Sequence, residues 1–479
     1  MVKWMIGFWI ICNLPAFAQN YKITIDPKGY QGDTILLGYH YGHRQYLRDT
    51  AFRTPGDIFI FEGPNALEPG LYMAIFPPKN DFIQFSVGAN EQEFKVTTES
   101  FDQKTPTITH IVNSPDNQIL LDYTRYLEKQ RPESERLQAL MKDSTIKNKE
   151  QVNQQILDIN KQVVKYQEEL IKRYPASMAA LLIRGNKVPD IPDTFTGTEQ
   201  EINEQKYRYY HEHYFDATDF SDVRLVRTPF IQNLIINYFE KVVVQHPDSV
   251  IQEVDRLLDK MKPNGELYRY TLIELLNYYA KVKFVGFDAI YVHIADNYFS
   301  KGEVNTLDKK QLDKIADSAA KLRPLLIGRQ APDIAMRKQN NEVIRLHEVR
   351  SPYTILFVWD PDCGHCKKSM PKVEEFYANY KNKGVEIFAV CGKFRTKEEP
   401  TGDSKCWEFI EQHAGMKPWL NVVDPYHQSN YKIIYDIKMT PQIYVLDENK
   451  VIKSKQIDAE DLPKILDFLL DPPIKTVTK

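Results

Sequence analysis

Cys363-Gly-His-Cys366 decides the fold of the last third of this chain. An apolar run, Tyr353-Thr-Ile-Leu-Phe-Val-Trp359, comes just before it, and its β-branched and aromatic residues predict a buried strand. The residues after the second cysteine have helical periodicity, with one apolar face made by Val373, Phe376, Tyr377 and Tyr380. The two cysteines therefore lie where a strand passes into the N-terminus of a helix.

A helix N-terminus has unpaired N–H groups and partial positive charge, and both stabilise a thiolate. Two cysteines with two residues between them can close a small disulfide ring and open it again, as dithiol–disulfide exchange requires. We expect Cys363, nearer the surface, to be the nucleophile and Cys366, one turn deeper, to be the resolving thiol. The alternatives are a static disulfide or half of a zinc site, and zinc needs a second close pair of ligands.

The surrounding residues resemble the thioredoxin superfamily, specifically its exported TlpA-like thiol–disulfide oxidoreductases. The matching residues are Trp359 before the motif, Lys367 and Pro371 after it, and Met439-Thr440-Pro441 ahead of an apolar strand. The resemblance covers roughly the last third of the chain. It implies an α/β thioredoxin-like domain over residues 326–479, in which Pro441 is a cis-proline that faces the dithiol.

The same resemblance implies a substrate-binding role for Thr440, Pro441 and Trp359. A cis peptide at Pro441 would turn the backbone of Thr440 toward the cysteines, where it can pair with an extended substrate strand. Trp359 would pack beside the motif and shape its rim. An ordinary trans proline and a plain core tryptophan are the alternatives.

Gly364, His365 and Pro371 are expected to tune the dithiol. The Gly-His dipeptide is similar to that of protein disulfide isomerases, and it predicts a more oxidising couple than that of thioredoxin. Two acidic groups found in relatives are missing, because Phe357 and Ser369 stand at their places. Proton transfer must then use another group or water.

Asp360 and Asp362 flank the motif, where each can assist proton transfer or cap the helix, and capping is the preferred role for Asp362. Cys391 ends a predicted strand and Cys406 begins a predicted helix. They form either a structural disulfide or two buried thiols, and a relay to the first pair is a third, less favoured alternative.

Residues 1–18 resemble a secretory signal peptide. Lys3 supplies the positive start, an apolar stretch follows, and Ala16-Phe-Ala18 precedes a cleavage position at Gln19. The apolar stretch is shorter than the ~20 residues that a membrane span needs. Lipidation at Cys12 is disfavoured by the bulky residue before it. We expect an exported, periplasmic protein, with envelope association as an alternative.

Two further domains are predicted between the signal and the thioredoxin-like part. Residues 19–100 have short apolar strands punctuated by turn residues, which predicts an all-β, sandwich-like domain with strands at 21–25, 34–39, 57–61, 70–76 and 82–87. It resembles, in architecture alone, the small β-domain that precedes thioredoxin-like domains in exported Bacteroidetes proteins. Residues 101–325 have helical periodicity and predict an all-α domain. The expected helices span 117–127, 149–174, 177–183, 199–214, 229–246, 248–261, 267–282, 288–298 and 309–322.

Composition narrows the function. The 479 residues carry a net charge of −3. The sequence therefore lacks the excess of basic residues that is typical of proteins that bind nucleic acids. The histidine pairs His40/His43 and His211/His213 lack a third ligand nearby, so no metal is expected. No cofactor is expected apart from the redox-active cysteine pair itself.

The leading hypothesis is an exported thiol–disulfide oxidoreductase that acts on protein thiols and disulfides. The resemblance implies reduction, with a membrane thiol electron donor or a small thiol pool behind it, while oxidation or isomerisation stays open. A peroxiredoxin lacks support, because Leu356 and Asp360 replace residues that such enzymes need ahead of their cysteine. The rival class is a binding or assembly protein in which the thioredoxin-like domain is mainly a docking module.

Overall fold

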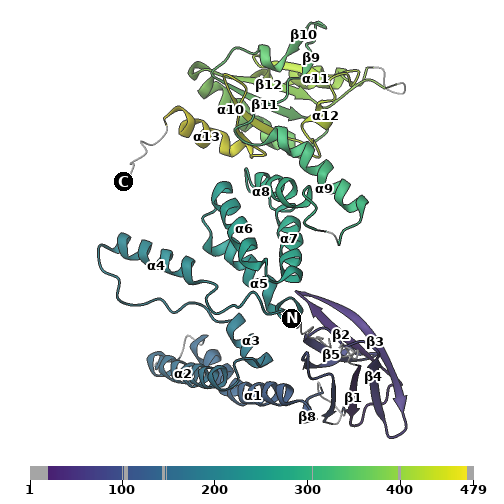
Figure 1. Cartoon of the computed structure of the whole chain (residues 1–479). Helices are drawn as coiled ribbons and strands as arrows, with labels where there is room; N and C mark the ends of the chain where they lie inside the picture. The colour runs from purple at the N-terminus through teal and green to yellow at the C-terminus, as the bar shows by residue number, and fades with distance from the viewer. Residues whose placement is uncertain are drawn as a thin grey trace, which may run out of the picture. The chain divides into compact units, whose positions relative to one another are not determined.

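The computed structural model describes residues 20–99, 101, 106–142, 146, 148–304, 306–396 and 401–471. The predicted signal peptide lies outside these residues. Two compact units are present: one holds the chain up to Val243 together with Arg256–Thr271, and the other holds Val244–Asp255 together with the chain from Leu272 onward. The predicted fold class is confirmed, with an all-β N-terminal part, a helical middle part and a thioredoxin-like α/β C-terminal part (Figure 1).

The N-terminal part of the first unit is one eight-stranded sheet with the order β6-β5-β2-β3-β4-β1-β7-β8. Strand β3 connects its two halves, because it pairs with β2 along most of its length and with β4 at its last two residues. The inward side chains, Phe59, Phe61 and Phe85 among them, form one apolar core. The strands are β1 (Tyr21–Pro27), β2 (Thr34–Tyr41), β3 (Arg44–Thr54), β4 (Ile58–Gly63), β5 (Gly70–Phe76), β6 (Asp81–Val87), β7 (Glu93–Thr98) and β8 (Ile108–Val112).

Sequence patterning did not predict β3, β7 and β8. Most side chains of β3 are exposed, so its sequence lacks the apolar alternation that marks a half-buried strand. Strand β8 lies beyond the predicted domain boundary at residue 100 and extends the sheet into the segment assigned to the helical domain.

The helical part is divided between the two units, with α1–α5 in the first, α8 and α9 in the second, and residues of α6 and α7 in both. Helix α1 continues through Pro132, well past its predicted end. No helix among the described residues combines the length and apolar character needed to cross a bilayer. The bounds are α1 (Pro115–Lys142), α2 (Lys149–Arg173), α3 (Met178–Gly185), α4 (Glu199–His213), α5 (Phe230–Asn237), α6 (Pro247–Met261), α7 (Gly265–Tyr279), α8 (Asp288–Ile294) and α9 (Lys309–Leu322).

The C-terminal part of the second unit is a seven-stranded sheet with the order β10-β9-β13-β12-β11-β14-β15. The three strands β11, β12 and β13 are parallel, and β14 joins β11 in the antiparallel direction. The elements are β9 (Ala335–Arg337), β10 (Val343–Arg345), β11 (Tyr353–Trp359), α10 (Gly364–Tyr380), β12 (Val385–Cys391), α11 (Ser404–Gln412), β13 (Leu420–Val423), α12 (Tyr431–Ile434), β14 (Gln442–Asp447), β15 (Ile452–Lys455) and α13 (Leu462–Leu470).

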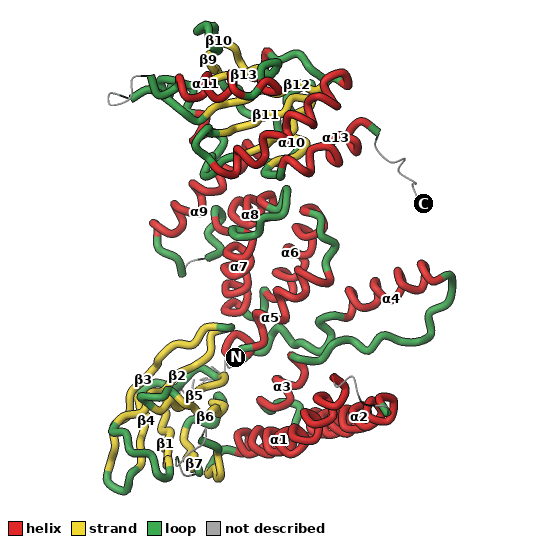
Figure 2. The backbone as a smooth tube through the Cα atoms, turned by 180° about the vertical axis from the view of Figure 1, so that it is seen from behind, coloured by secondary structure: helices red, strands yellow, loops and turns green. Residues whose placement is uncertain are grey.

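Both faces of this sheet are covered, which explains the unbroken apolar run of β11. Ile355, Phe357 and Trp359 belong to a core shared with α10, α11 and α13. Leu356 and Val358 belong to a second core, which includes α12 and the segment before β9. Figure 2 shows α10 and α13 running along the sheet.

A buried ion pair joins this sheet to the helical segment within the second unit. Lys455 of β15 is 2% exposed, and its ammonium pairs with Asp288, the first residue of α8. The same ammonium donates to the carbonyl oxygen of Leu325 at 2.6 Å. A lysine is rarely buried without such partners, because its desolvation is costly.

Replacing Asp288 with Asn should destabilise the second unit by about 3–5 kcal/mol, because the Lys455 ammonium then stays buried without a counter-charge. Urea unfolding followed by circular dichroism measures the loss. The double variant Asp288→Asn/Lys455→Met should recover most of it. Asp313→Asn, which breaks the exposed Lys309–Asp313 pair, is the matched control and should leave the midpoint unchanged. Equal midpoints for Asp288→Asn and wild type would contradict this role.

Candidate active site

Cys363 is the N-cap residue of α10, at the end of the turn that follows β11. Its backbone is extended (φ −78°, ψ 116°), and its Sγ accepts a hydrogen bond from the N–H of Cys366 at 3.2 Å. The sulfur thus satisfies one of the free N–H groups of the helix start, which favours the thiolate. Cys363 is partly exposed and Cys366 is buried, and both are free thiols.

The two thiols differ in acidity. Burial by itself raises the pKa of Cys363, but hydrogen bonds with the Cys366 thiol, with Thr440 and with the N–H groups of Cys366 and His365 outweigh it, so the pKa lies below the usual thiol value. Burial, followed by the hydrogen bond to Cys363, raises the pKa of Cys366 to about 12. The arrangement therefore gives one reactive, accessible sulfur and one that stays protonated.

The Thr440–Pro441 peptide bond is cis, and the structure brings it to the dithiol. The Cys363 thiol donates to the carbonyl oxygen of Thr440 at 3.2 Å, although the two residues are 77 positions apart in the chain. Thr440 and Pro441 are both partly exposed, and the adjacent Met439 side chain is 70% exposed. Backbone and apolar surface thus lie beside the sulfur where a substrate segment can bind.

The remaining predicted residues occupy different environments. Gly364 and His365 are exposed in the first turn of α10, and Pro371 is exposed further along the same helix. Trp359 is fully buried in the core and packs on Phe409, with ring centroids 5.1 Å apart. The expectation that Trp359 shapes the substrate-binding rim is therefore wrong, because no part of its side chain reaches the surface.

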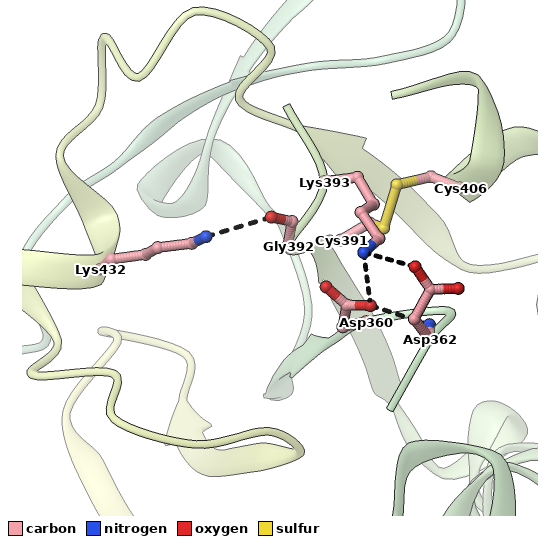
Figure 3. Close-up of a disulfide and its surroundings, with 7 residues drawn as sticks. All are labelled: Asp360, Asp362, Cys391, Gly392, Lys393, Cys406 and Lys432. Carbon is pink, nitrogen blue, oxygen red and sulfur yellow. Dashed lines mark hydrogen bonds and ion pairs between the residues drawn. A yellow bond between two sulfur atoms is a disulfide. The ribbon is translucent and has the colours of Figure 1, made fainter. Parts of the chain in front are cut away.

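Cys391 and Cys406 form a disulfide that ties the end of β12 to α11 (Figure 3). Their exposed fractions are 1% and 0%, and both residues belong to the same core as Cys366. The sequence alone is equally compatible with a disulfide and with two free thiols at these positions. Because these sulfurs are buried, a thiol in solution cannot reach them without unfolding, so the bond serves structure.

Three charged groups beside the dithiol form an ion cluster that sequence analysis did not find. The Lys393 ammonium lies 3.2 Å from Oδ1 of Asp360 and 2.7 Å from Oδ2 of Asp362 (Figure 3). Lys393 holds the pKa of Asp362 below its usual value. The preferred capping role of Asp362 is wrong, because Cys363 itself is the N-cap and the carboxylate of Asp362 is turned toward Lys393. In the sequence, the one feature that places Lys393 near the dithiol is its position two residues after Cys391, at the end of a predicted strand.

One histidine of each pair contacts a polar side chain of the protein. A ring nitrogen of His40 lies 2.9 Å from the Gln84 amide, and one of His211 lies 3.0 Å from the Tyr238 hydroxyl. Among the described residues no group of three or more His, Cys, Asp or Glu side chains is arranged to hold a metal ion.

Two parts of the chain match protein families. Residues 327–455 match the AhpC/TSA family, and residues 144–321 match a domain family of unknown function, DUF5106. The prediction of a thioredoxin-superfamily domain is thus confirmed.

Curated relatives of this domain are thiol–disulfide oxidoreductases named ResA. The protein of Halalkalibacterium halodurans is 31% identical over 104 residues, which are 21% of this chain and 55% of that protein. The protein of Bacillus anthracis is 36% identical over 64 residues, which are 13% of this chain and 37% of that protein. The chain thus spans about half, or less, of the length of these relatives.

Solved structures also resemble parts of the chain. A thioredoxin-like protein from Bacteroides caccae is 16% identical and has a TM-score of 0.44, with 59% of this chain and 98% of that chain covered. A domain of a possible thiol-disulfide isomerase from Cytophaga hutchinsonii is 37% identical, with a TM-score of 0.27 and with 30% of this chain and 94% of that chain covered.

The two thiols should react with iodoacetamide in a fixed order as the pH rises. Alkylation requires the thiolate, so the lowered pKa of Cys363 allows its labelling below the pH at which an ordinary cysteine reacts. Cys366, with a pKa of about 12, should stay unlabelled until strongly alkaline pH. Both cysteines lie on the single tryptic peptide 351–367, so tandem mass spectrometry of this peptide locates the label and measures the order. Labelling of Cys366 first would contradict the assignment of nucleophile and resolving thiol.

Removing the Cys391–Cys406 disulfide with Cys391→Ser/Cys406→Ser should lower the free energy of unfolding by about 3 kcal/mol. The cross-link joins residues 15 positions apart, and without it the unfolded chain gains conformational entropy. The urea midpoint of the second unit measures this loss. When the folded wild-type chain is treated with dithiothreitol and then with an alkylating reagent, Cys391 and Cys406 should stay unlabelled, because both sulfurs are buried and the disulfide is not reduced. Rapid labelling of Cys391 under native conditions would show that the bond is accessible.

Proposed function

We propose that this chain is an exported thiol–disulfide oxidoreductase that exchanges disulfides with protein substrates through Cys363 and Cys366. The observation that carries the proposal is the dithiol geometry: an accessible sulfur of lowered pKa caps α10, and a buried sulfur of raised pKa lies beneath it. The curated relatives are named for the same chemistry, which supports the assignment.

The exchange begins when the Cys363 thiolate attacks one sulfur of a substrate disulfide. A bond forms between Cys363 and that sulfur, and the other substrate sulfur leaves as a thiolate. Cys366 then loses its proton and attacks the Cys363 sulfur, which releases the second substrate thiol. The products are two substrate thiols and a Cys363–Cys366 disulfide, so two electrons pass from the protein to the substrate.

The cis Thr440–Pro441 segment orients the substrate in this scheme. The Thr440 carbonyl lies within hydrogen-bond distance of the nucleophile, so an extended chain bound along this backbone brings its disulfide close to Cys363. The exposed Met439 offers an apolar contact next to it. A protein or peptide fits this open surface better than a small molecule, which would need an enclosed pocket.

An exported location agrees with the signal-like sequence at residues 1–18 and with the Cys391–Cys406 disulfide, since disulfides persist in oxidising compartments. To act again as a reductant, the Cys363–Cys366 disulfide needs a dithiol donor, for which a membrane thiol protein is our proposal. The reverse direction, oxidation or isomerisation, uses the same atoms. The reduction potential of the pair distinguishes the two.

The wild-type chain should reduce insulin disulfides in the presence of dithiothreitol, and Cys363→Ser should abolish the catalysed rate because the attacking sulfur is gone. Insulin turbidity measures the rate. Cys366→Ser should instead accumulate a mixed disulfide with the substrate, visible on non-reducing gels, because the resolving thiol is missing.

Lys417→Met serves as the control, since it removes an exposed charge that pairs with Glu411 in the same domain and should retain the activity. Equal insulin reduction by wild type and Cys363→Ser would reject the proposal. It would favour a binding or assembly protein, in which the thioredoxin-like domain docks.

A further inference from the structure

Asp360 stabilises the turn that precedes Cys363. The Oδ1 atom of Asp360 accepts the N–H of Asp362 at 2.8 Å, and its carbonyl oxygen accepts the N–H of Cys363 at 3.2 Å. Asp360 therefore sets the backbone path from β11 to the N-cap of α10. Its carboxylate, and that of Asp362, place two negative charges in the turn that leads to Cys363, whose sulfur must itself become negative.

Lys393 contacts both of these carboxylates with one ammonium (Figure 3). Its side chain is 23% exposed, and that of Asp360 is 24% exposed, so this half of the cluster is well shielded from water. An ion pair with limited solvent access is screened less than a surface pair. Asp362 is 64% exposed, so the ammonium holds the Asp360 end of the turn more firmly, while it pairs with both carboxylates and offsets their charge.

The position of Lys393 is itself fixed by the residues just before it. Cys391 is held by its disulfide, and the N–H of Gly392 donates to the carbonyl oxygen of Trp359 at 2.7 Å. The carbonyl oxygen of Gly392 accepts from the ammonium of Lys432 at 3.1 Å. The backbone just before Lys393 is therefore held by the disulfide and by both polar groups of Gly392, directly beside the end of β11.

Further charged groups surround the cluster. The positive charges of Lys367 in α10 and Lys405 in α11 attract the Asp362 carboxylate. The ammonium of Lys432 in α12 is attracted by the Asp360 carboxylate and repelled by the Lys393 ammonium. His365 is exposed in the first turn of α10. Of these cations, Lys393 is the one that pairs with both aspartates.

We propose that Lys393 is a positioning residue of the dithiol site. It holds the Asp360–Cys363 turn through both carboxylates and offsets their charge where the Cys363 thiolate forms. This inference rests on the proposed function for its biological meaning, but it concerns a property of Cys363 that can be measured without any substrate. Nothing in the sequence motif around the cysteines indicates it, because Lys393 lies on another loop.

Lys393→Met should slow the iodoacetamide labelling of Cys363 at pH 7 by about threefold and shift its pH midpoint upward, because two uncompensated carboxylates disfavour the thiolate. Lys393→Arg should label at close to the wild-type rate. Adding Asp362→Asn to Lys393→Met should recover most of the rate, since one of the two negative charges is then removed. Mass spectrometry of the Cys363 peptide across a pH series provides the rates.

Lys417→Met is the matched control, because it breaks a single 2.7 Å pair with Glu411 in the same domain and should leave the labelling of Cys363 unchanged. A wild-type profile for Lys393→Met would overturn the proposal, as would an equal shift in Lys417→Met. Labelling of Cys366 at neutral pH in Lys393→Met would also overturn it, since it would mean that the site has opened. Failure of the wild type to reduce insulin would count against the proposed function and leave these rates valid.

Discussion

The hydrogen bond from the N–H of Cys366 to the sulfur of Cys363 is the contact on which the site depends. It exists because β11, buried on both faces, ends at Trp359 and leaves four residues to turn into α10. The free N–H groups of a helix start need acceptors, and here a thiol occupies the place that a serine or aspartate side chain usually takes. The Cys363 sulfur thus caps the helix by accepting an N–H group, and the same hydrogen bond stabilises its thiolate.

Patterns within single segments predicted much of this fold. The strand β11 and the buried face of α10 were predictable because each produces a pattern of apolar residues within one continuous segment. The mostly exposed β3 escaped prediction, since a strand whose side chains face water has no apolar alternation. The continuation of α1 past Pro132 escaped it as well, because proline usually marks the end of a helix.

The two cysteines of the dithiol and the cis-proline segment were predictable because each lies in a local motif. Other parts of the site depend on where separate loops meet. The Cys391–Cys406 pairing was left undecided because two cysteines fifteen residues apart can equally pack as free thiols. Trp359 lies close to the motif in sequence, yet the pleat of β11 turns its side chain into the core. Lys393 joins the site only through the parallel pairing of β11 with β12.

The Lys455–Asp288 pair has a consequence for how this protein can be divided. A fragment beginning at residue 326, where the sequence suggests that the thioredoxin-like domain starts, would keep the lysine and lose both Asp288 and the carbonyl of Leu325. The buried Lys455 ammonium would then lose both of these partners. A fragment that starts before Asp288 retains both partners, so the cut that preserves this ion pair falls inside the helices and not at the boundary suggested by composition.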